Sequence, residues 1–282
     1  LGMQTDAILK AITPKTRAVF LSHIQGFNAL TDELLSGLEA KGIPLIEDVC
    51  ESHGATHKGK KAGSFGWTSN FSFYYAHHIS TIEGGMICTN DEDTYRNLRM
   101  MRSHGMIREN GDPDVQAHWA GENPELNPQF IFSFPAYNVR NTEIGGVLGL
   151  SQLKRLDANN IRRTENMMRF LGRIDPEKFQ TDFEIEGSSN YAFNLVQREA
   201  DDDLARRLMA AMDKQEIEYR RGSAGGGNQV RQPYVQSYLP TPDEYKKYPV
   251  TEHVHFYGYY IGNFPELKLD DVDFISDVLN NA

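Results

Sequence analysis

The sequence contains very little cysteine, and its cysteines are isolated. Only Cys50 and Cys88 occur among the 282 residues, and neither belongs to a Cys-x-x-Cys pair. We therefore predict no disulfide framework, no metal site and no iron–sulfur cluster. Sparse cysteine is also typical of proteins in a reducing compartment, so we expect a cytoplasmic location.

Long apolar runs and an excess of positive charge are also missing. No run of apolar residues approaches the ~20 that a membrane-spanning helix requires. The formal net charge of -10 would repel nucleic acids and anionic membranes, so neither is expected as a partner. A local basic pocket could still bind a phosphorylated small molecule. With 39% hydrophobic and 24% charged residues, the chain has the composition of an ordinary globular protein rather than a disordered one.

The first part of the chain alternates between β-prone apolar runs and helical patterns. Thr31 is a helix N-cap candidate, and Gly42 marks the end of the helix that follows. Strand, helix and strand in this order, with short connections, indicate a parallel sheet covered by helices. The expected strands are 18–24, 44–49, 70–75 and 85–89, and the expected helices are 31–41 and 91–103.

The second part of the chain begins with a long polar stretch. Residues 106–130 are rich in Gly, Pro, Asn and Glu and predict a surface loop, whereas residues 142–173 have the apolar spacing of a helix. We predict a large α/β domain at 1–158 and a small α+β domain at 159–282. In the small domain the expected strands are 189–197 and 216–220, and the expected helices are 201–214 and 270–279.

A carboxylate stands at the end of one predicted parallel strand. Asp48 follows the apolar residues of strand 44–49, and open α/β sheets bind their ligands at the carboxyl ends of the strands. Taken alone, Asp48 could equally cap a turn or pair with a surface base.

Two adjacent histidines end another predicted strand. His77 and His78 close the segment that begins at Phe71, and on a strand their side chains would point to opposite faces, so they could not easily share a metal ion. An isolated pair of this kind is more often structural than catalytic.

Together these segments resemble a known family. The pattern ED-x-x-x-x-HG begins at Glu47, the strand end FSFYYAHH at Phe71, EGG at Glu83 and FPAYNVRNTE at Phe134. Their order and spacing resemble the DegT/DnrJ/EryC1/StrS sugar aminotransferases over essentially the whole chain. The resemblance implies the fold type I architecture of pyridoxal phosphate (PLP)-dependent transferases, which is aspartate aminotransferase-like. It also implies that part of the large domain precedes Leu1, so that the chain is N-terminally truncated.

The sequence departs from the family at the cofactor-binding lysine. His77 occupies that position, and the nearest lysines, Lys58, Lys60 and Lys61, lie in a turn-like segment. This substitution resembles the 3-dehydratase branch, which removes the C3 hydroxyl of a nucleotide-linked 4-keto-6-deoxyhexose. The resemblance points to GDP-4-keto-6-deoxymannose, to the PLP and pyridoxamine phosphate forms of the cofactor, and to glutamate as amino donor. A nucleotide-sugar aminotransferase and an inactive PLP-binding homologue remain alternatives.

The resemblance assigns roles to residues near the cofactor. His77 would be the catalytic acid and base, because imidazole titrates near neutral pH. Asp48 would face the pyridine nitrogen and keep it protonated. Ser72 would bind the cofactor phosphate, Glu51 would lie near the ring hydroxyl, and Asn138 would reach the cofactor of a partner subunit. A homodimer with shared active sites is therefore implied.

Substrate-binding residues are expected in two further segments. The resemblance makes His104 and Arg140 candidates for substrate binding. Arg220 and Arg221 precede a Gly-rich loop, 222–227, whose backbone could approach a diphosphate. A mobile loop exposed to solvent is an equally good interpretation of this segment.

Overall fold

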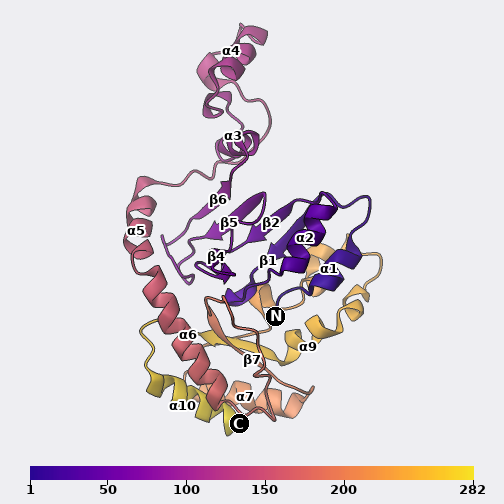
Figure 1. Cartoon of the computed structure of the whole chain (residues 1–282), viewed down its shortest axis with the longest axis vertical. Coiled ribbons are helices and arrows are strands. Elements are labelled where there is room, and N and C mark those ends of the chain that lie inside the picture. The colour runs from indigo at the N-terminus through magenta and orange to yellow at the C-terminus, as the bar shows by residue number, and fades with distance from the viewer.

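The computed structural model describes the whole chain, Leu1–Ala282. A four-stranded sheet and a three-stranded sheet form the centres of two parts of the molecule, and the long helix α6 runs beside both (Figure 1). None of the helices is both long enough and apolar enough to cross a lipid bilayer.

The larger sheet contains the predicted strands, with one change of direction. Its order is β1-β2-β5-β6, in which β1, β2 and β5 are parallel and β6 runs antiparallel to β5. No helix lies between β5 and β6 to carry the chain back for a parallel crossover. The strands are β1 (Val19–Ser22), β2 (Leu45–Asp48), β5 (Thr68–Ser72) and β6 (Gly85–Thr89). Thus β5 ends three residues earlier than predicted.

Helix α2 (Asp32–Ala40) confirms the predicted capping signals. The Thr31 hydroxyl accepts a hydrogen bond from the backbone N–H of Leu34 at 3.0 Å, and Gly42 has a φ of 62° just after the helix. The apolar face of α2 packs with α1 (Thr5–Ala11) against β1 and β2. The buried residues of this core are Ile8, Val19, Leu21, Ala29, Leu30, Leu34, Leu38 and Leu45.

The predicted surface loop over 106–130 lies at the surface but is partly helical. This stretch contains helix α4 (Pro113–Glu122) between two short 3-10 turns. Asp112 caps α4, and Pro113 is its first residue. The backbone N–H that proline lacks would have no hydrogen-bond partner within the helix at this position. Its polar composition suits a helix with no buried residue. With α3 (Glu92–Met101), α4 projects away from the larger sheet (Figure 1).

The helical stretch 142–173 consists of two helices rather than one. Helix α5 (Glu143–Leu153) ends before Lys154 and Arg155, and α6 (Leu156–Arg173) starts afterwards. Helix α6 packs against α10 (Leu269–Asn280). The domain boundary after residue 158 remains a prediction.

The smaller sheet has a central strand that the sequence did not reveal. Its order is β7-β9-β8, with both pairs antiparallel. The strands are β7 (Ala192–Val196), β9 (Gly258–Gly262) and β8 (Tyr219–Arg221). Strand β9 is short, has glycine at both ends and directly follows the unpredicted helix α9 (Pro249–Tyr257), so its local pattern is weak.

The smaller sheet is covered on one side by helices. Helix α7 (Asp202–Lys214), which is capped by Asp201, packs with α6 and α10 around the largest core of the molecule. Fully buried members of this core include Met167, Phe170, Phe179, Phe193, Leu208, Met212, Val272 and Leu279. The remaining elements are the hairpin β3 (Thr56–His57) and β4 (Lys60–Lys61) and the one-turn helix α8 (Pro233–Gln236).

A buried carboxylate fixes the loop between the hairpin and β5. Glu47 is fully buried, and its Oε1 accepts hydrogen bonds from the N–H groups of Phe65 (2.8 Å) and Gly66 (2.7 Å). Its Oε2 accepts from the N–H of Gly63 (2.7 Å) and faces Nε2 of His23 (3.3 Å). Burial alone would raise the pKa of Glu47, but these hydrogen bonds outweigh it and lower that pKa.

We predict that Glu47→Gln destabilises the fold. The amide nitrogen of the introduced glutamine would face backbone N–H donors. The neutral side chain would also lose the charge-assisted hydrogen bonds, so the free energy of unfolding should fall by roughly 3 kcal/mol. Urea unfolding followed by circular dichroism measures this change. Glu39→Gln, at an exposed position of α2, is the matched control and should match the wild type.

The same substitution should change the pH dependence of stability. The folded-state pKa of Glu47 is lowered, so its contribution is present above the unfolded-state pKa and is lost as the pH falls through the folded-state pKa. The wild type should therefore lose more stability on acidification than Glu47→Gln. Parallel curves for the two proteins would contradict this role.

Candidate active site

The carboxyl ends of β2 and β5 bring polar side chains together. Asp48 lies opposite Asn70 in the parallel register, and Ser72 follows two residues later on the same face of β5. The N–H of Val49 donates to the Asn70 carbonyl at 2.9 Å, which continues the pairing beyond Asp48. This edge is where ligands bind in open α/β sheets.

The Asp48 carboxylate is held in one orientation. Its Oδ1 accepts hydrogen bonds from the N–H of Cys50 and from Nδ2 of Asn70, both at 3.0 Å. Its Oδ2 has only a long contact of 3.5 Å, from the Ser22 hydroxyl. Oδ2 is therefore left to accept a strong hydrogen bond from a cationic donor. This geometry fits a protonated pyridine nitrogen.

The residues after β5 form a hydrogen-bonded turn. The Ser72 hydroxyl accepts from the N–H of Tyr74 at 3.2 Å, and the Tyr74 carbonyl accepts from the N–H of His77 at 3.0 Å. The prediction that the two histidines lie on a strand is therefore wrong. They still face different surroundings, because His77 is half-buried whereas His78 is buried, with its Nε2 3.3 Å from the Ser189 carbonyl.

The His77 imidazole is packed between aromatic rings. Its centroid lies 5.5 Å from that of Tyr74 and 5.6 Å from that of Tyr191, both in edge-to-face arrangements. Its Nδ1 is buried and has no hydrogen-bond partner. Burial lowers the pKa of His77, and the negative charge of Asp48 partly offsets this effect. The neutral imidazole is thus available as a proton acceptor near neutral pH.

Glu51 lies beside the same edge. Its Oε2 accepts a hydrogen bond from the N–H of Gln25 at 2.8 Å. Burial raises the pKa of Glu51, and the negative charge of Asp48 adds to this rise. Burial together with the Glu51 charge also raises the pKa of Tyr191 to about 12. A second acidic group with an altered pKa is therefore part of this region, which is common at functional sites.

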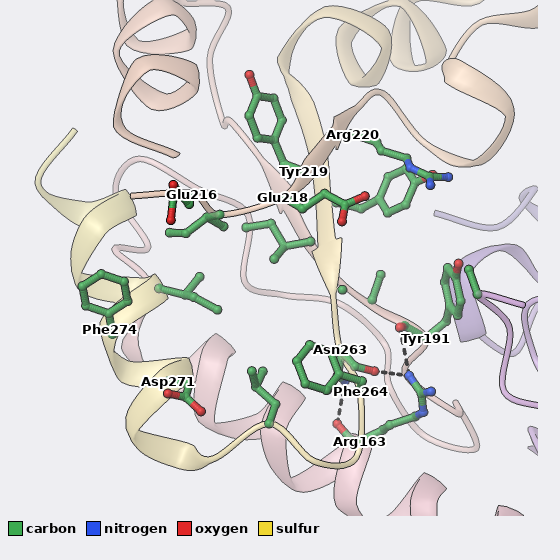
Figure 2. Close-up of a pocket in the computed structure, with 18 of the residues that line it drawn as sticks. Arg163, Tyr191, Glu216, Glu218, Tyr219, Arg220, Asn263, Phe264, Asp271 and Phe274 are labelled. Atoms are coloured by element: carbon green, nitrogen blue, oxygen red, sulfur yellow. Dashed lines mark hydrogen bonds between the residues drawn. The ribbon is translucent and has the colours of Figure 1, made fainter. Parts of the chain in front are cut away.

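A cavity of about 440 Å³ extends from the His77 turn toward the smaller sheet. Tyr75 and Ala76 line one end of it, and Figure 2 shows Tyr191 and Arg163 on one side with Phe274 far across the cavity. Arg163 donates to the carbonyls of Tyr191 and Asn263 (Figure 2). The volume is within the range of small-molecule sites.

The two predicted arginines on β8 do not act together. Arg220 lines the cavity, and its Nη1 lies 3.5 Å from the Tyr260 hydroxyl. Arg221 belongs to the opposite face of β8, where its guanidinium lies 5.9 Å from the centre of the Phe256 ring. Strand alternation separates the two side chains.

The other predicted substrate-side residues form a separate cluster. The N–H of His104 donates to the Tyr137 carbonyl at 2.7 Å, and Nε of Arg140 donates to Oδ1 of Asn138 at 3.2 Å. No hydrogen bond or ion pair joins this cluster to Asp48. Asn138 and Arg140 are exposed, so they are free to serve another molecule.

The Gly-rich loop is closed against α9 rather than open. Gly225, Gly226 and Gly227 have φ values of 71°, 83° and 86°, which only glycine adopts readily. Directly after them, Nδ2 of Asn228 donates to Oε1 of Glu252 at 2.7 Å, and Arg231 makes an ion pair with the same carboxylate. A contact between this loop and a diphosphate remains a prediction.

Sequence reasoning missed several residues at this site. Asn70 could have been found, because it lies two positions before Ser72 and shares its strand face. Gln25 and Tyr191 gave no local signal, since both reach the site only through tertiary packing.

Comparison with known proteins gives consistent matches. The model of the DegT/DnrJ/EryC1/StrS aminotransferase family matches residues 1–280. The GDP-4-keto-6-deoxy-D-mannose 3-dehydratase of Escherichia coli O55:H7 is 30% identical over 288 residues, which cover 99% of this chain and 71% of that protein.

Solved structures match over the same length. The E. coli GDP-4-keto-6-deoxy-D-mannose-3-dehydratase with bound hydrated PLP is 29% identical, with a TM-score of 0.82 over 99% of this chain and 71% of that one. A structure of the same kind of enzyme with a trapped PLP-glutamate geminal diamine is 28% identical, with a TM-score of 0.80 over 99% and 72%. These likenesses confirm the predicted fold class.

We predict that Cys50 is unreactive in the native protein. Its thiol pKa is raised to about 12 by burial and by the neighbouring Asp48 carboxylate, so only ~10⁻⁴ of it is thiolate at pH 8. Alkylation with iodoacetamide, followed by peptide mass spectrometry, should modify the exposed Cys88 much faster. Asp48→Asn should speed the modification of Cys50, because it removes the nearby negative charge. Equal rates at the two cysteines would contradict this packing.

Proposed function

The chain belongs to the DegT/DnrJ/EryC1/StrS aminotransferase family, and on that premise we propose that it is a PLP-dependent sugar 3-dehydratase. It removes the C3 hydroxyl of a nucleotide-linked 4-keto-6-deoxyhexose, for which GDP-4-keto-6-deoxymannose is our candidate, and uses glutamate as amino donor. The observation that carries this proposal is that the turn after β5 carries His77, and no lysine, near Asp48.

The residues present fit the cofactor of this family. Asp48 would accept a hydrogen bond from the pyridine nitrogen through Oδ2, and Ser72 would bind the phosphate. Glu51 would lie near the ring hydroxyl. When bound as pyridoxamine phosphate, the cofactor supplies an amine for the C4 ketone and a ring that accepts electron density.

His77 performs the proton transfers that the reaction requires. Its burial keeps the imidazole neutral, so it can first take up a proton. The imidazolium that results can then protonate the departing C3 hydroxyl, which leaves as water. A positioned group of this kind contributes ~10²–10⁴-fold in rate.

The geometry favours a dehydratase over an aminotransferase. An aminotransferase of this family needs a lysine at the turn, and the nearby lysines are engaged elsewhere. Lys58 pairs with Asp32, and Nζ of Lys61 donates to Asp157 at 3.1 Å. An inactive PLP-binding protein would not need the acid and base function that His77 provides.

We place the reaction in cytoplasmic deoxysugar biosynthesis. A 3,6-dideoxyhexose such as colitose, a component of lipopolysaccharide O-antigens, is the kind of product that this chemistry leads to. The E. coli and Yersinia pseudotuberculosis relatives carry names with the same substrate, which supports this placement.

We also propose a homodimer with shared active sites. Helix α5 has large apolar side chains that are exposed to solvent, and so does the segment that precedes it. These residues are Tyr137, Val139, Ile144, Val147, Leu150 and Leu153. Asn138 and Arg140 lie within this apolar surface, where they could reach the site of a second copy.

An activity assay tests the proposed function directly. The protein is incubated with PLP, glutamate and a panel of nucleotide-linked 4-keto sugars, and products are identified by mass. We expect a sugar that has lost the C3 hydroxyl, and His77→Asn should reduce its formation ~10²–10⁴-fold. His78→Asn should keep most of the activity and lower the melting temperature, because His78 is buried against Ser189. An amino sugar as sole product would refute the proposal.

Sedimentation velocity at micromolar concentration tests the homodimer. We expect a dimer that buries well above ~2,000 Å² in total. Val147→Asp should dissociate it, because a charge would be buried at the centre of the apolar surface. Val250→Asp is the control, since Val250 on α9 is 77% exposed and Val147 70% exposed. A monomeric wild type with full activity would contradict this proposal.

A further inference from the structure

His77 makes no short hydrogen bond of the kind that usually orients a catalytic histidine. In most such sites one ring nitrogen donates to a carboxylate or a carbonyl, which fixes the tautomer and the ring plane. Here Nδ1 of His77 is buried without a partner. The Ser72 carbonyl favours the protonated imidazole, and the aromatic rings around His77 supply further contacts.

Two tyrosine rings occupy the positions around this imidazole. Tyr74 comes from the same turn and meets His77 at an interplanar angle of 74°. Tyr191 comes from the segment before β7 and meets it at 80°. Edge-to-face pairs at such separations are favourable and have a preferred geometry, so they restrict rotation of the ring between them.

The segment that carries Tyr191 is itself firmly anchored. The N–H of Thr56 donates to the Gly187 carbonyl at 2.7 Å, and the N–H of Ser189 donates to the Gly26 carbonyl at 2.8 Å. Nδ2 of Asn190 donates to the Thr164 hydroxyl at 2.9 Å. The segment that precedes Tyr191 is thus tied to β3, to the turn after β1 and to α6.

We propose that Tyr191 is a positioning residue for His77, and that its ring, with that of Tyr74, supplies the orientation that a short hydrogen bond usually gives. This role rests on the proposed function, since it matters for catalysis only if His77 transfers protons. Tyr191 also excludes water from the imidazole. The charged and titratable groups around His77 are Asp48 on β2, the histidines His53 and His78, and the two tyrosines.

Nuclear magnetic resonance titration of the histidine rings tests the inference without any turnover. In protein labelled with ¹³C at histidine Cε1, the His77 signal is assigned by its loss in His77→Asn. Tyr191→Leu should admit water and raise the pKa of His77 toward its ordinary value, because burial is what lowers it. Tyr191→Phe keeps the ring and should leave the titration as in the wild type.

A matched control separates this effect from general damage to the cavity. Phe264 lines the same cavity without an aromatic contact to His77, so Phe264→Leu should leave the His77 titration unchanged. Tyr74→Leu removes the other ring that contacts His77 and should act in the same direction as Tyr191→Leu. It also serves as the test if Tyr191→Leu fails to fold. An unchanged His77 titration in the leucine variants would overturn the inference.

Kinetics then distinguish the failure of this inference from failure of the proposed function. Tyr191→Leu should lower kcat for the sugar ~10-fold with little change in KM, and shift the acidic limb of the pH profile upward. If the titration moves but no 4-keto sugar is dehydrated, the positioning role stands and the proposed function fails. If sugar is dehydrated and Tyr191→Leu changes neither the titration nor the pH profile, only the positioning role fails.

Discussion

The buried carboxylate of Glu47 is the constraint on which the site depends. Glu47 and Asp48 are consecutive residues of β2, so their side chains point to opposite faces of the sheet. Glu47 binds the N–H groups that precede β5, which fixes that strand beside β2. Asp48 then meets Asn70 across the register, and its carboxylate has one orientation. The buried carboxylate of Glu47, which has a structural role, thus positions the neighbouring carboxylate of Asp48 at the site.

The segment Gly187–Tyr191 makes the second essential link. It connects the smaller sheet to the turn that follows β1 and to the hairpin β3–β4, and it accepts a hydrogen bond from His78. Because His77 and His78 are consecutive, fixing His78 also restricts the backbone of His77. The turn that carries His77 and His78 is therefore held by the segment Gly187–Tyr191 as well as by β5.

The replacement of lysine by histidine changes what the site must supply. A lysine amine binds the cofactor covalently and is held by that bond. An imidazole has no such attachment, so its orientation must come from the protein. The aromatic contacts of His77 and the hydrogen bonds of its turn meet this need, and the same burial keeps the ring neutral.

Interactions between residues close together in the chain determine many of the helices and strands, and the sequence by itself was enough to predict these elements. Thr31 caps its helix as predicted, and Asp91 and Asp201 cap theirs in the same way, because a side-chain oxygen reaches an N–H only two or three residues away. The motifs that contain Asp48 and His77 likewise indicated the family. Tertiary structure alone decided the central strand β9 and the contact of Tyr191 with His77. These depend on packing between segments far apart in the chain, and no local spacing encodes which distant surfaces will exclude water together.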